Sequence, residues 1–244
     1  MSGVRGTRGF YHRRSMARVP ALLLALLALV LFAAACGEDD EPAPAAEETA
    51  TATEEPTTTE GGCEKAEAPE PGEDGKLKRP RDRLDPDTTT VAKVTTNCGE
   101  FEITLDAKDA PRTGGSFAYL AREGFYDDLI FHRIVSGFVI QGGDPTGSGQ
   151  GGPGYSVVEA PPRDLVYEKG VVAMAKTEVE EPGTSGSQFF VVTAEDAQLP
   201  ADYALVGRVT KGQEVVDKIG VAPVGPDDRP ADPVVIQKIE IEER

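Results

Sequence analysis

The composition of the chain changes sharply near residue 91, and this boundary confines the folded core to the C-terminal part. Residues 37–90 contain 17 acidic and 6 basic residues and, apart from Leu77 and Leu84, hardly a large apolar side chain. Such a segment buries too little apolar surface to offset the entropy lost on ordering. We therefore predict a disordered acidic linker rich in Pro, Thr and Glu over residues 36–90, and one folded domain over residues 91–244.

The N-terminus has the three parts of a secretory leader. Residues 1–35 carry five arginines and no acidic residue, and they include an apolar run from Val19 to Phe32, which is followed by three alanines and then Cys36. This run of 14 residues is short for a bilayer-spanning helix, which needs about 20. The sequence therefore predicts a removable signal peptide over residues 1–35, and a retained anchor helix is the weaker interpretation.

Small residues before Cys36 and the acidic tract after it resemble a bacterial lipoprotein processing site. The resemblance implies that Cys36 becomes the lipidated first residue of the mature protein, which would lie at the outer face of the cytoplasmic membrane. The pattern departs from that of such lipoproteins at Ala33, where Leu is more usual. Cleavage after Ala35 and release of a secreted protein therefore stays open.

Charge and histidine content exclude several functional classes. The chain has 25 Lys and Arg against 42 Asp and Glu, a net charge of −17. Because phosphate neutralisation needs clustered positive charge, we expect no nucleic acid partner. His12 lies in the predicted leader, so a catalytic triad or a histidine-based metal site would depend on His132 alone. We expect neither a metal nor another cofactor.

The cysteines suggest an oxidising compartment. If Cys36 carries lipid, Cys63 and Cys98 remain as an even pair, for which a disulfide is the natural expectation outside the cytoplasm. It would fasten the end of the linker to the first hairpin of the domain. Two unpaired thiols are the alternative.

From Val91 onward, apolar residues recur at the spacing of β-strands, with Gly and Pro turns between them. Helices are expected from Pro111 to Gly124 and from Gln213 to Ile219. The pattern favours an all-β barrel or sandwich. Because the sequence shows no apolar heptad repeat and no long edge strand, we expect a monomer. The expected strands cover residues 91–96, 100–106, 129–135, 138–141, 170–175, 187–193, 203–210 and 233–243.

Three motifs follow one another in this region. FHRIVSGFVIQGGD (131–144) places Arg133 in an apolar strand, and GVVAMA (170–175) and GTSGSQFFVV (183–192) come later. Together, and in this order, they resemble the cyclophilin family of peptidyl-prolyl cis-trans isomerases over about residues 91–241. The resemblance implies an eight-stranded antiparallel β-barrel closed by two α-helices, with a substrate groove on the outer face.

The same resemblance implies roles for individual residues. Arg133 matches the catalytic arginine, while the walls and polar lining of the substrate groove match Phe138, Val139, Gln141, Ala175, Gln188, Phe190, Leu199 and Tyr203. Gln198 stands where many members have Trp, from which we expect weakened cyclosporin binding. A longer loop, Thr177 to Glu181, adds three acidic residues at the edge of the groove.

The chemistry of X-Pro isomerisation explains why an arginine suffices. Rotation about this bond meets a barrier of roughly 18–20 kcal/mol because amide resonance is lost. No bond is broken, so the reaction needs a donor aimed at the proline nitrogen in a pocket that excludes water. Arg133, with Phe138 and Phe190, supplies both. His132 points to the opposite face of the strand and is expected to be structural.

We therefore predict a peptidyl-prolyl cis-trans isomerase that needs no cofactor. Its expected partners are proline-containing segments of exported or cell-envelope proteins, whose folding it assists. The lipid on Cys36 is expected to attach the protein to the membrane. One alternative is a module that binds proline-containing peptides at the cell surface without turnover, and another is a structural scaffold. The presence of Arg133 favours the enzyme.

Overall fold

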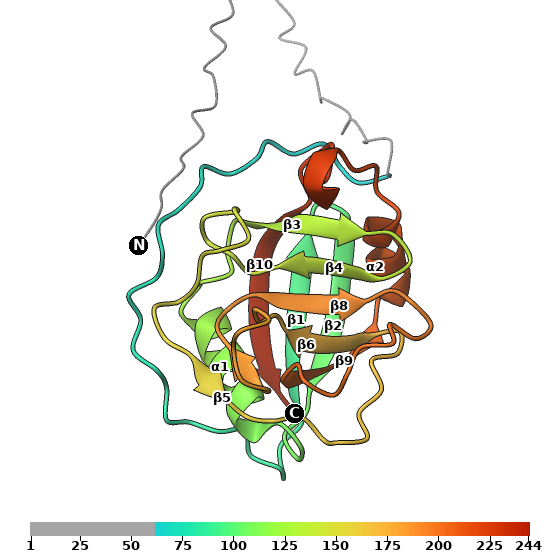
Figure 1. Ribbon diagram of the computed structural model, residues 1–244. Coiled ribbons are helices and arrows are strands. Elements are labelled where there is room, and N and C mark those ends of the chain that lie inside the picture. Colours follow the sequence, from blue (N-terminus) through green and yellow to red (C-terminus); the bar gives the residue numbers. More distant parts are fainter. Residues whose placement is uncertain (1–61) are drawn as a thin grey trace, which may run out of the picture. The chain divides into compact units, whose positions relative to one another are not determined.

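The computed structural model describes residues 62–244 (Figure 1). The predicted signal peptide, Cys36 and linker residues 37–61 lie outside the described residues. Among the described residues, no helix has the length and hydropathy needed to cross a bilayer.

Eight antiparallel strands close into a barrel in the order β1-β10-β3-β4-β8-β6-β9-β2. Each one overlaps a strand expected from the sequence, so the prediction of an eight-stranded antiparallel barrel is confirmed. A separate two-stranded sheet pairs β5 (Val157–Val158) with β7 (Thr184–Ser185), and the sequence analysis missed it. The barrel strands are β1 (Thr90–Thr96), β2 (Gly99–Leu105), β3 (Leu129–Val135), β4 (Val139–Gly142), β6 (Val171–Met174), β8 (Phe189–Val192), β9 (Leu205–Lys211) and β10 (Val235–Glu243).

Alternation along the strands separates the barrel interior from its outer surface. On β1, Ala92 and Val94 are fully buried in the main core. On the next strand, Phe101 pairs with Val94 and Ile103 with Ala92, so these four side chains share the inner face. The period of two residues in the sequence thus becomes the wall of a closed core.

Two helices pack on opposite sides of the barrel (Figure 1). Helix α1 (Pro111–Arg122) begins with a proline. An N–H group in the first turn of a helix has no acceptor within the helix, so the absence of this group in proline costs no hydrogen bond there. Helix α1 buries Phe117 and Leu120 against the barrel, while α2 (Gln213–Gly220) buries Val216 and Ile219. A short 3-10 helix, η1 (Pro226–Asp228), lies beside β3.

Residues 62–89 form an extended segment that runs along the barrel surface, drawn blue-green in Figure 1. We call it the N-terminal strap. The prediction of a disordered linker as far as residue 90 is wrong for this part. Leu84 is only 8% exposed within the main core, where it contacts Gly114 of α1. One buried leucine, a disulfide and main-chain hydrogen bonds hold the strap, although its average composition is that of a disordered chain.

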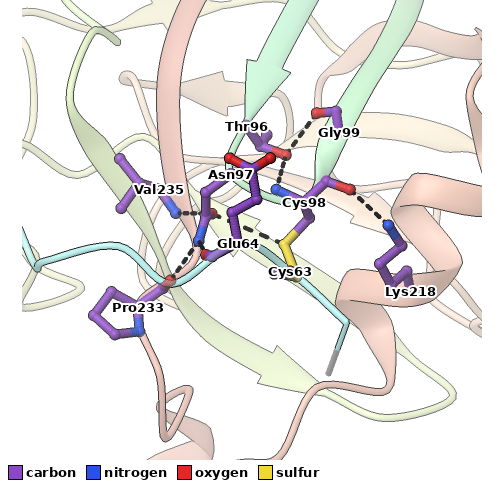
Figure 2. Close-up of a disulfide and its surroundings, with 9 residues drawn as sticks. All are labelled: Cys63, Glu64, Thr96, Asn97, Cys98, Gly99, Lys218, Pro233 and Val235. Carbon is purple, nitrogen blue, oxygen red and sulfur yellow. Dashed lines mark hydrogen bonds between the residues drawn. A yellow bond between two sulfur atoms is a disulfide. The ribbon is translucent and has the colours of Figure 1, made fainter. Parts of the chain in front are cut away.

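Cys63 at the start of the strap forms a disulfide with Cys98 in the β1–β2 turn (Figure 2). Asn97 reinforces this junction from the same turn. Its side-chain amide donates to the carbonyl oxygen of Glu64 at 2.7 Å, and its Oδ1 accepts from the main-chain N–H of Val235 at 2.9 Å. The strap, the first hairpin and the start of β10 are therefore fastened at one point.

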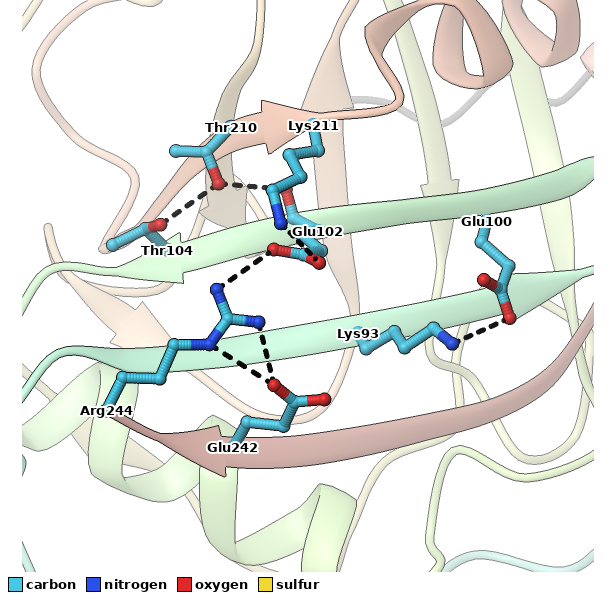
Figure 3. A network of polar contacts seen from close by, with 8 residues as sticks. All are labelled: Lys93, Glu100, Glu102, Thr104, Thr210, Lys211, Glu242 and Arg244. Carbon is cyan, nitrogen blue, oxygen red and sulfur yellow. Dashed lines mark hydrogen bonds and ion pairs between the residues drawn. The ribbon is translucent and has the colours of Figure 1, made fainter.

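The outer surface over β10, β1, β2 and β9 is covered by charged side chains (Figure 3). Lys93 pairs with Glu100 at 3.0 Å, and Lys211 pairs with Glu102 at 3.0 Å. The hydrogen bond from Lys211 lowers the pKa of Glu102. Exposed pairs of this kind add little stability, so this face of the barrel is best described as a solvated surface.

Candidate active site

A cavity of about 180 Å³ lies on the outer face of the barrel over β3, β4 and β8. It brings together Arg133 and most of the residues that the sequence assigned to the groove. Gln188 lines a neighbouring pocket instead, next to Gln141. The cavity is lined by Arg133, Phe138, Val139, Gln141, Ala175, Lys176, Phe190, Leu199 and Tyr203.

The register of the sheet explains why these residues meet. Arg133 on β3 is the cross-strand partner of Gln141 on β4, and Gln141 is in turn the partner of Phe190 on β8. Side chains of direct partners point to the same face of a sheet. A cationic, an amide and an aromatic side chain therefore form one row across three strands.

The apolar wall belongs to a second cluster, separate from the barrel core. Phe190 is 4% exposed, and its ring meets that of Tyr203 edge to face at 5.5 Å. Phe138 and Leu199 are partly buried against the same cluster. Such a wall offers apolar contact to a small ring while excluding water.

Tyr167 supports this wall from below, and the sequence analysis did not single it out. The side chain is fully buried, and its hydroxyl donates to the carbonyl oxygen of Tyr203 at 2.6 Å while accepting from the N–H of Tyr203 at 3.0 Å. Burial raises the pKa of Tyr167 to about 12, so the phenol stays protonated. Only the tertiary structure shows this double contact.

Arg133 lies at the rim of the cavity, and its side chain is 40% exposed. Its Nε lies 3.3 Å from Oδ2 of Asp228 in η1. Within residues 62–244, its two terminal nitrogens have no hydrogen-bond partner, and they are thus available to a substrate. The sequence analysis missed Asp228, because no short-range pattern connects a turn residue to a side chain 95 positions earlier.

A chain of amides extends from the cavity into the neighbouring pocket. Nε2 of Gln141 donates to Oε1 of Gln188 at 3.0 Å, and Nε2 of Gln188 donates to the carbonyl oxygen of Gly151 at 2.9 Å. Lys176 lines both pockets, but its side chain is only 5% exposed and its Nζ pairs with Asp202 at 3.0 Å. The amides are thereby oriented, and the lysine is held away from solvent.

His132 does not line the cavity. It is 6% exposed, and neither ring nitrogen has a hydrogen-bond partner among the described residues. Burial lowers the pKa of His132 despite the nearby carboxylate of Asp144. The imidazole is therefore neutral at pH 7 and takes no part in the groove.

The site thus combines a permanently charged donor with an apolar wall. Arginine keeps its charge at all physiological pH values and presents several N–H groups in a fixed plane. Between residues 62 and 244 no group of three His, Cys, Asp or Glu side chains is placed to hold a metal ion. The arrangement suits stabilisation of a polar transition state next to a bound apolar ring.

Comparison with known proteins agrees with this geometry. The family described as cyclophilin type peptidyl-prolyl cis-trans isomerase/CLD matches residues 91–241. Peptidyl-prolyl cis-trans isomerase A of Mycobacterium tuberculosis is 38% identical over 174 residues, which cover 64% of this chain and 94% of that protein. Peptidyl-prolyl cis-trans isomerase CYP18-2 of Arabidopsis thaliana is 37% identical over 150 residues, covering 60% of this chain and 90% of that protein.

A solved structure adds evidence on the fold. A cyclophilin type isomerase of Cryptosporidium parvum, crystallised in the presence of the dipeptide Ala-Pro, is 32% identical with a TM-score of 0.59. The similarity covers 63% of this chain and 99% of that one. The family match includes more than half of the chain and every strand of the barrel except the first residue of β1 and the end of β10. The chain therefore belongs to the cyclophilin-type peptidyl-prolyl cis-trans isomerases.

Proposed function

We propose that this isomerase acts on X-Pro bonds of exported or cell-envelope proteins, with Arg133 as its catalytic residue. The observation that carries the catalytic assignment is the row of Arg133, Gln141 and Phe190 across β3, β4 and β8. It places a charged donor at the rim of a cavity with one apolar wall, large enough for a side chain as small as proline.

In the proposed mechanism, the proline ring lies against Phe138, Phe190 and Leu199. As the X-Pro bond twists, amide resonance is lost and the lone pair of the proline nitrogen becomes available. A terminal N–H of Arg133 donates to this nitrogen only in the twisted state. The interaction is therefore stronger in the transition state than in the ground state, which is the condition for acceleration.

Gln141 and Gln188 have a binding role in this proposal. The hydrogen bond between their amides fixes the orientation of both side chains, leaving Oε1 of Gln141 to accept from a peptide N–H. Lost side-chain entropy on binding is smaller when such groups are already oriented. They hold the peptide backbone across the groove while the proline rotates.

The refolding of an exported protein whose slow phase is X-Pro isomerisation tests this function. We expect the parent to accelerate the slow phase and Arg133→Gln, which retains N–H donors on a shorter, neutral side chain, to do so poorly. A protein that binds the unfolded client and leaves the slow phase unchanged would contradict the proposal and support a binding module.

The proposed location rests on the N-terminal sequence and on the disulfide. We infer that residues 1–35 direct export and that Cys36 carries the lipid that holds the protein at the outer face of the cytoplasmic membrane. The Cys63–Cys98 disulfide supports export, because disulfides persist mainly outside the cytoplasm. Residues 37–61 then separate the lipid from the strap.

Metabolic labelling with a fatty acid tests the anchor. The full chain should incorporate the label and fractionate with membranes, while Cys36→Ser should be unlabelled. An unlabelled parent whose mature N-terminus is Cys36 would show cleavage by an ordinary signal peptidase and a secreted protein. Retention of residues 1–35 in the mature chain would contradict the export pathway proposed here.

A further inference from the structure

A second pocket, of about 390 Å³, adjoins the proline cavity, and the N-terminal strap provides part of its wall. Gln141, Ala175 and Lys176 line both pockets. Asp74 of the strap lines the second one, and so does Glu180 from the longer acidic loop. Asp74 lies outside residues 91–241, which match the family. This wall is therefore a feature of this chain beyond the barrel.

Main-chain hydrogen bonds fix the strap against the loop that forms the pocket. The N–H groups of Gly72, Gly75 and Leu77 donate to carbonyl oxygens of that loop, at Pro145, Gly152 and Pro153, over 2.9, 2.8 and 3.0 Å. Between them, Oδ1 of Asp74 accepts from the N–H of Gly152 at 3.0 Å. The carboxylate of Asp74 is thereby held at the pocket.

Glycines make this close approach feasible. A Cβ at Gly75 would lie 2.8 Å from Cε2 of Phe125 and 2.9 Å from Cα of Pro153. Gly154 adopts a φ of 88°, and a Cβ there would collide with the carbonyl oxygen of Gly75. Two chain segments thus lie in direct main-chain contact, which only glycine permits.

The pocket is negatively charged. The one cation that lines it is Lys176, whose Nζ is already engaged with Asp202 at 3.0 Å and with the carbonyl oxygens of Thr177 and Glu180 at 3.3 Å. The carboxylates of Asp74 and Glu180 accept hydrogen bonds from N–H or hydroxyl groups but have no cationic partner among the described residues. Two carboxylates therefore remain to attract a positive charge.

The two pockets adjoin each other, because three residues line both of them. In an extended peptide, side chains two residues apart point to the same side, about 6.5 Å from each other. We therefore expect a peptide whose proline lies in the cavity beside Arg133 to present a side chain two residues away to the adjoining second pocket.

We propose that Asp74 is a specificity-determining residue, which gives the enzyme a preference for peptides with Lys or Arg two residues from the proline. The inference rests on the proposed use of the groove beside Arg133 as the substrate site. Glu180, in the loop after β6, lines the same pocket and contributes to the same preference. The long stem of a lysine or arginine lets its charge reach these carboxylates while the backbone stays in the groove.

Matched peptides test the proposal. One series carries Lys two residues before the proline and another two residues after it, each with norleucine and Glu counterparts of similar length. We would measure kcat/KM at low salt for the parent, Asp74→Asn and the control Glu73→Gln. Asn retains an acceptor for the N–H of Gly152, and Glu73 is an exposed strap residue that does not line the pocket.

In the parent, we expect Lys to be favoured over norleucine by about three-fold in at least one series, because an exposed charge pair changes an equilibrium by up to about five-fold. The ratio should fall toward one in Asp74→Asn, stay at the parent value in Glu73→Gln and shrink with added salt. Glu180→Gln should lower the ratio as well, which provides a second test if Asp74→Asn folds poorly.

Equal kcat/KM for Lys and norleucine in both series would overturn the proposal. So would an unchanged ratio in folded Asp74→Asn or, if that variant does not fold, in Glu180→Gln. The norleucine peptides separate this failure from failure of the proposed function. If the folded parent does not accelerate their isomerisation, the groove is not the catalytic site, whereas acceleration without a charge preference refutes only the role of Asp74.

Discussion

Removal of the Cys63–Cys98 disulfide should lower the free energy of unfolding by about 4 kcal/mol. The bond joins residues 35 positions apart. In the chain-entropy model, closing a loop of this length removes about 13 cal/mol/K from the unfolded state, which is about 3.8 kcal/mol at 25 °C. For a domain of this size, each kcal/mol shifts Tm by about 2–4 °C, so the expected fall in Tm is about 8–15 °C.

The native state should change little when the bond is lost. Both cysteines are buried, and Asn97 keeps its hydrogen bonds to Glu64 and Val235. Cys63→Ala with Cys98→Ala therefore removes the cross-link without introducing a buried hydroxyl. The stabilisation should appear mainly as a difference between the two unfolded states.

Urea unfolding followed by far-ultraviolet circular dichroism measures the effect, since the chain has no tryptophan. The parent in reductant should match the double alanine variant, and the variant should not respond to reductant. A loss below about 1 kcal/mol would refute the reasoning, because it would mean that the strap leaves the barrel long before the domain unfolds.

Three further predictions follow from the site and its surroundings. Tyr167→Phe should destabilise the protein by about 1–3 kcal/mol in urea unfolding, because it leaves the main-chain groups of Tyr203 without their buried partner; an unchanged midpoint would contradict this. Asp228→Asn should lower kcat by about three-fold at unchanged stability, because the charge that orients Nε of Arg133 is lost; full activity would show that the ion pair has no orienting role. Burial depresses the folded-state pKa of His132 below 6.5, so the unfolded chain binds the proton more tightly. Unfolding free energy should therefore be unaffected above pH 7 and fall as the pH drops below 6.5, by up to about 1.4 kcal/mol per pH unit, with the fall reduced in His132→Gln; parallel pH profiles for the two proteins would refute it.

Strand positions were predictable because the barrel is built from alternation. Each strand with one face in the core leaves a period of two residues in the sequence, and Gly and Pro residues separate the strands. β5 and β7 escaped because two residues carry no period. Their pairing depends on loops that the barrel brings together.

The strap was missed because its anchoring is not a property of its own composition. Leu84 becomes a core residue only when α1 presents Gly114 to it, and a Cβ at Gly115 would lie 2.7 Å from the carbonyl oxygen of Asp82. Two adjacent glycines inside a helix are locally unfavourable. They were the one signal in the sequence that another segment lies against this helix.

The candidate site divides in the same way. Arg133, Phe138 and Phe190 lie in sequence motifs that resemble those of the family and follow in the same order. The resemblance alone therefore predicts that they belong to the site. Tyr167 and Asp228 act through contacts between segments far apart in the chain, at 36 and 95 positions from their partners. Such contacts leave no local pattern, and only the closed barrel shows them.

The measurement that tests the central claim most directly is the cis-to-trans relaxation rate of a short Ala-Pro peptide with the purified protein, Arg133→Ala and Arg208→Ala. Arg208 is a matched control, because it is also half exposed and pairs with a carboxylate, Glu168, at 3.0 Å. We predict that Arg208→Ala accelerates the relaxation as much as the parent does. In Arg133→Ala the catalysed rate should fall by about 100-fold, as expected when a transition-state donor is removed. An Arg133→Ala protein that is folded and retains acceleration within a few-fold of the parent would contradict the assignment of Arg133 as the catalytic residue.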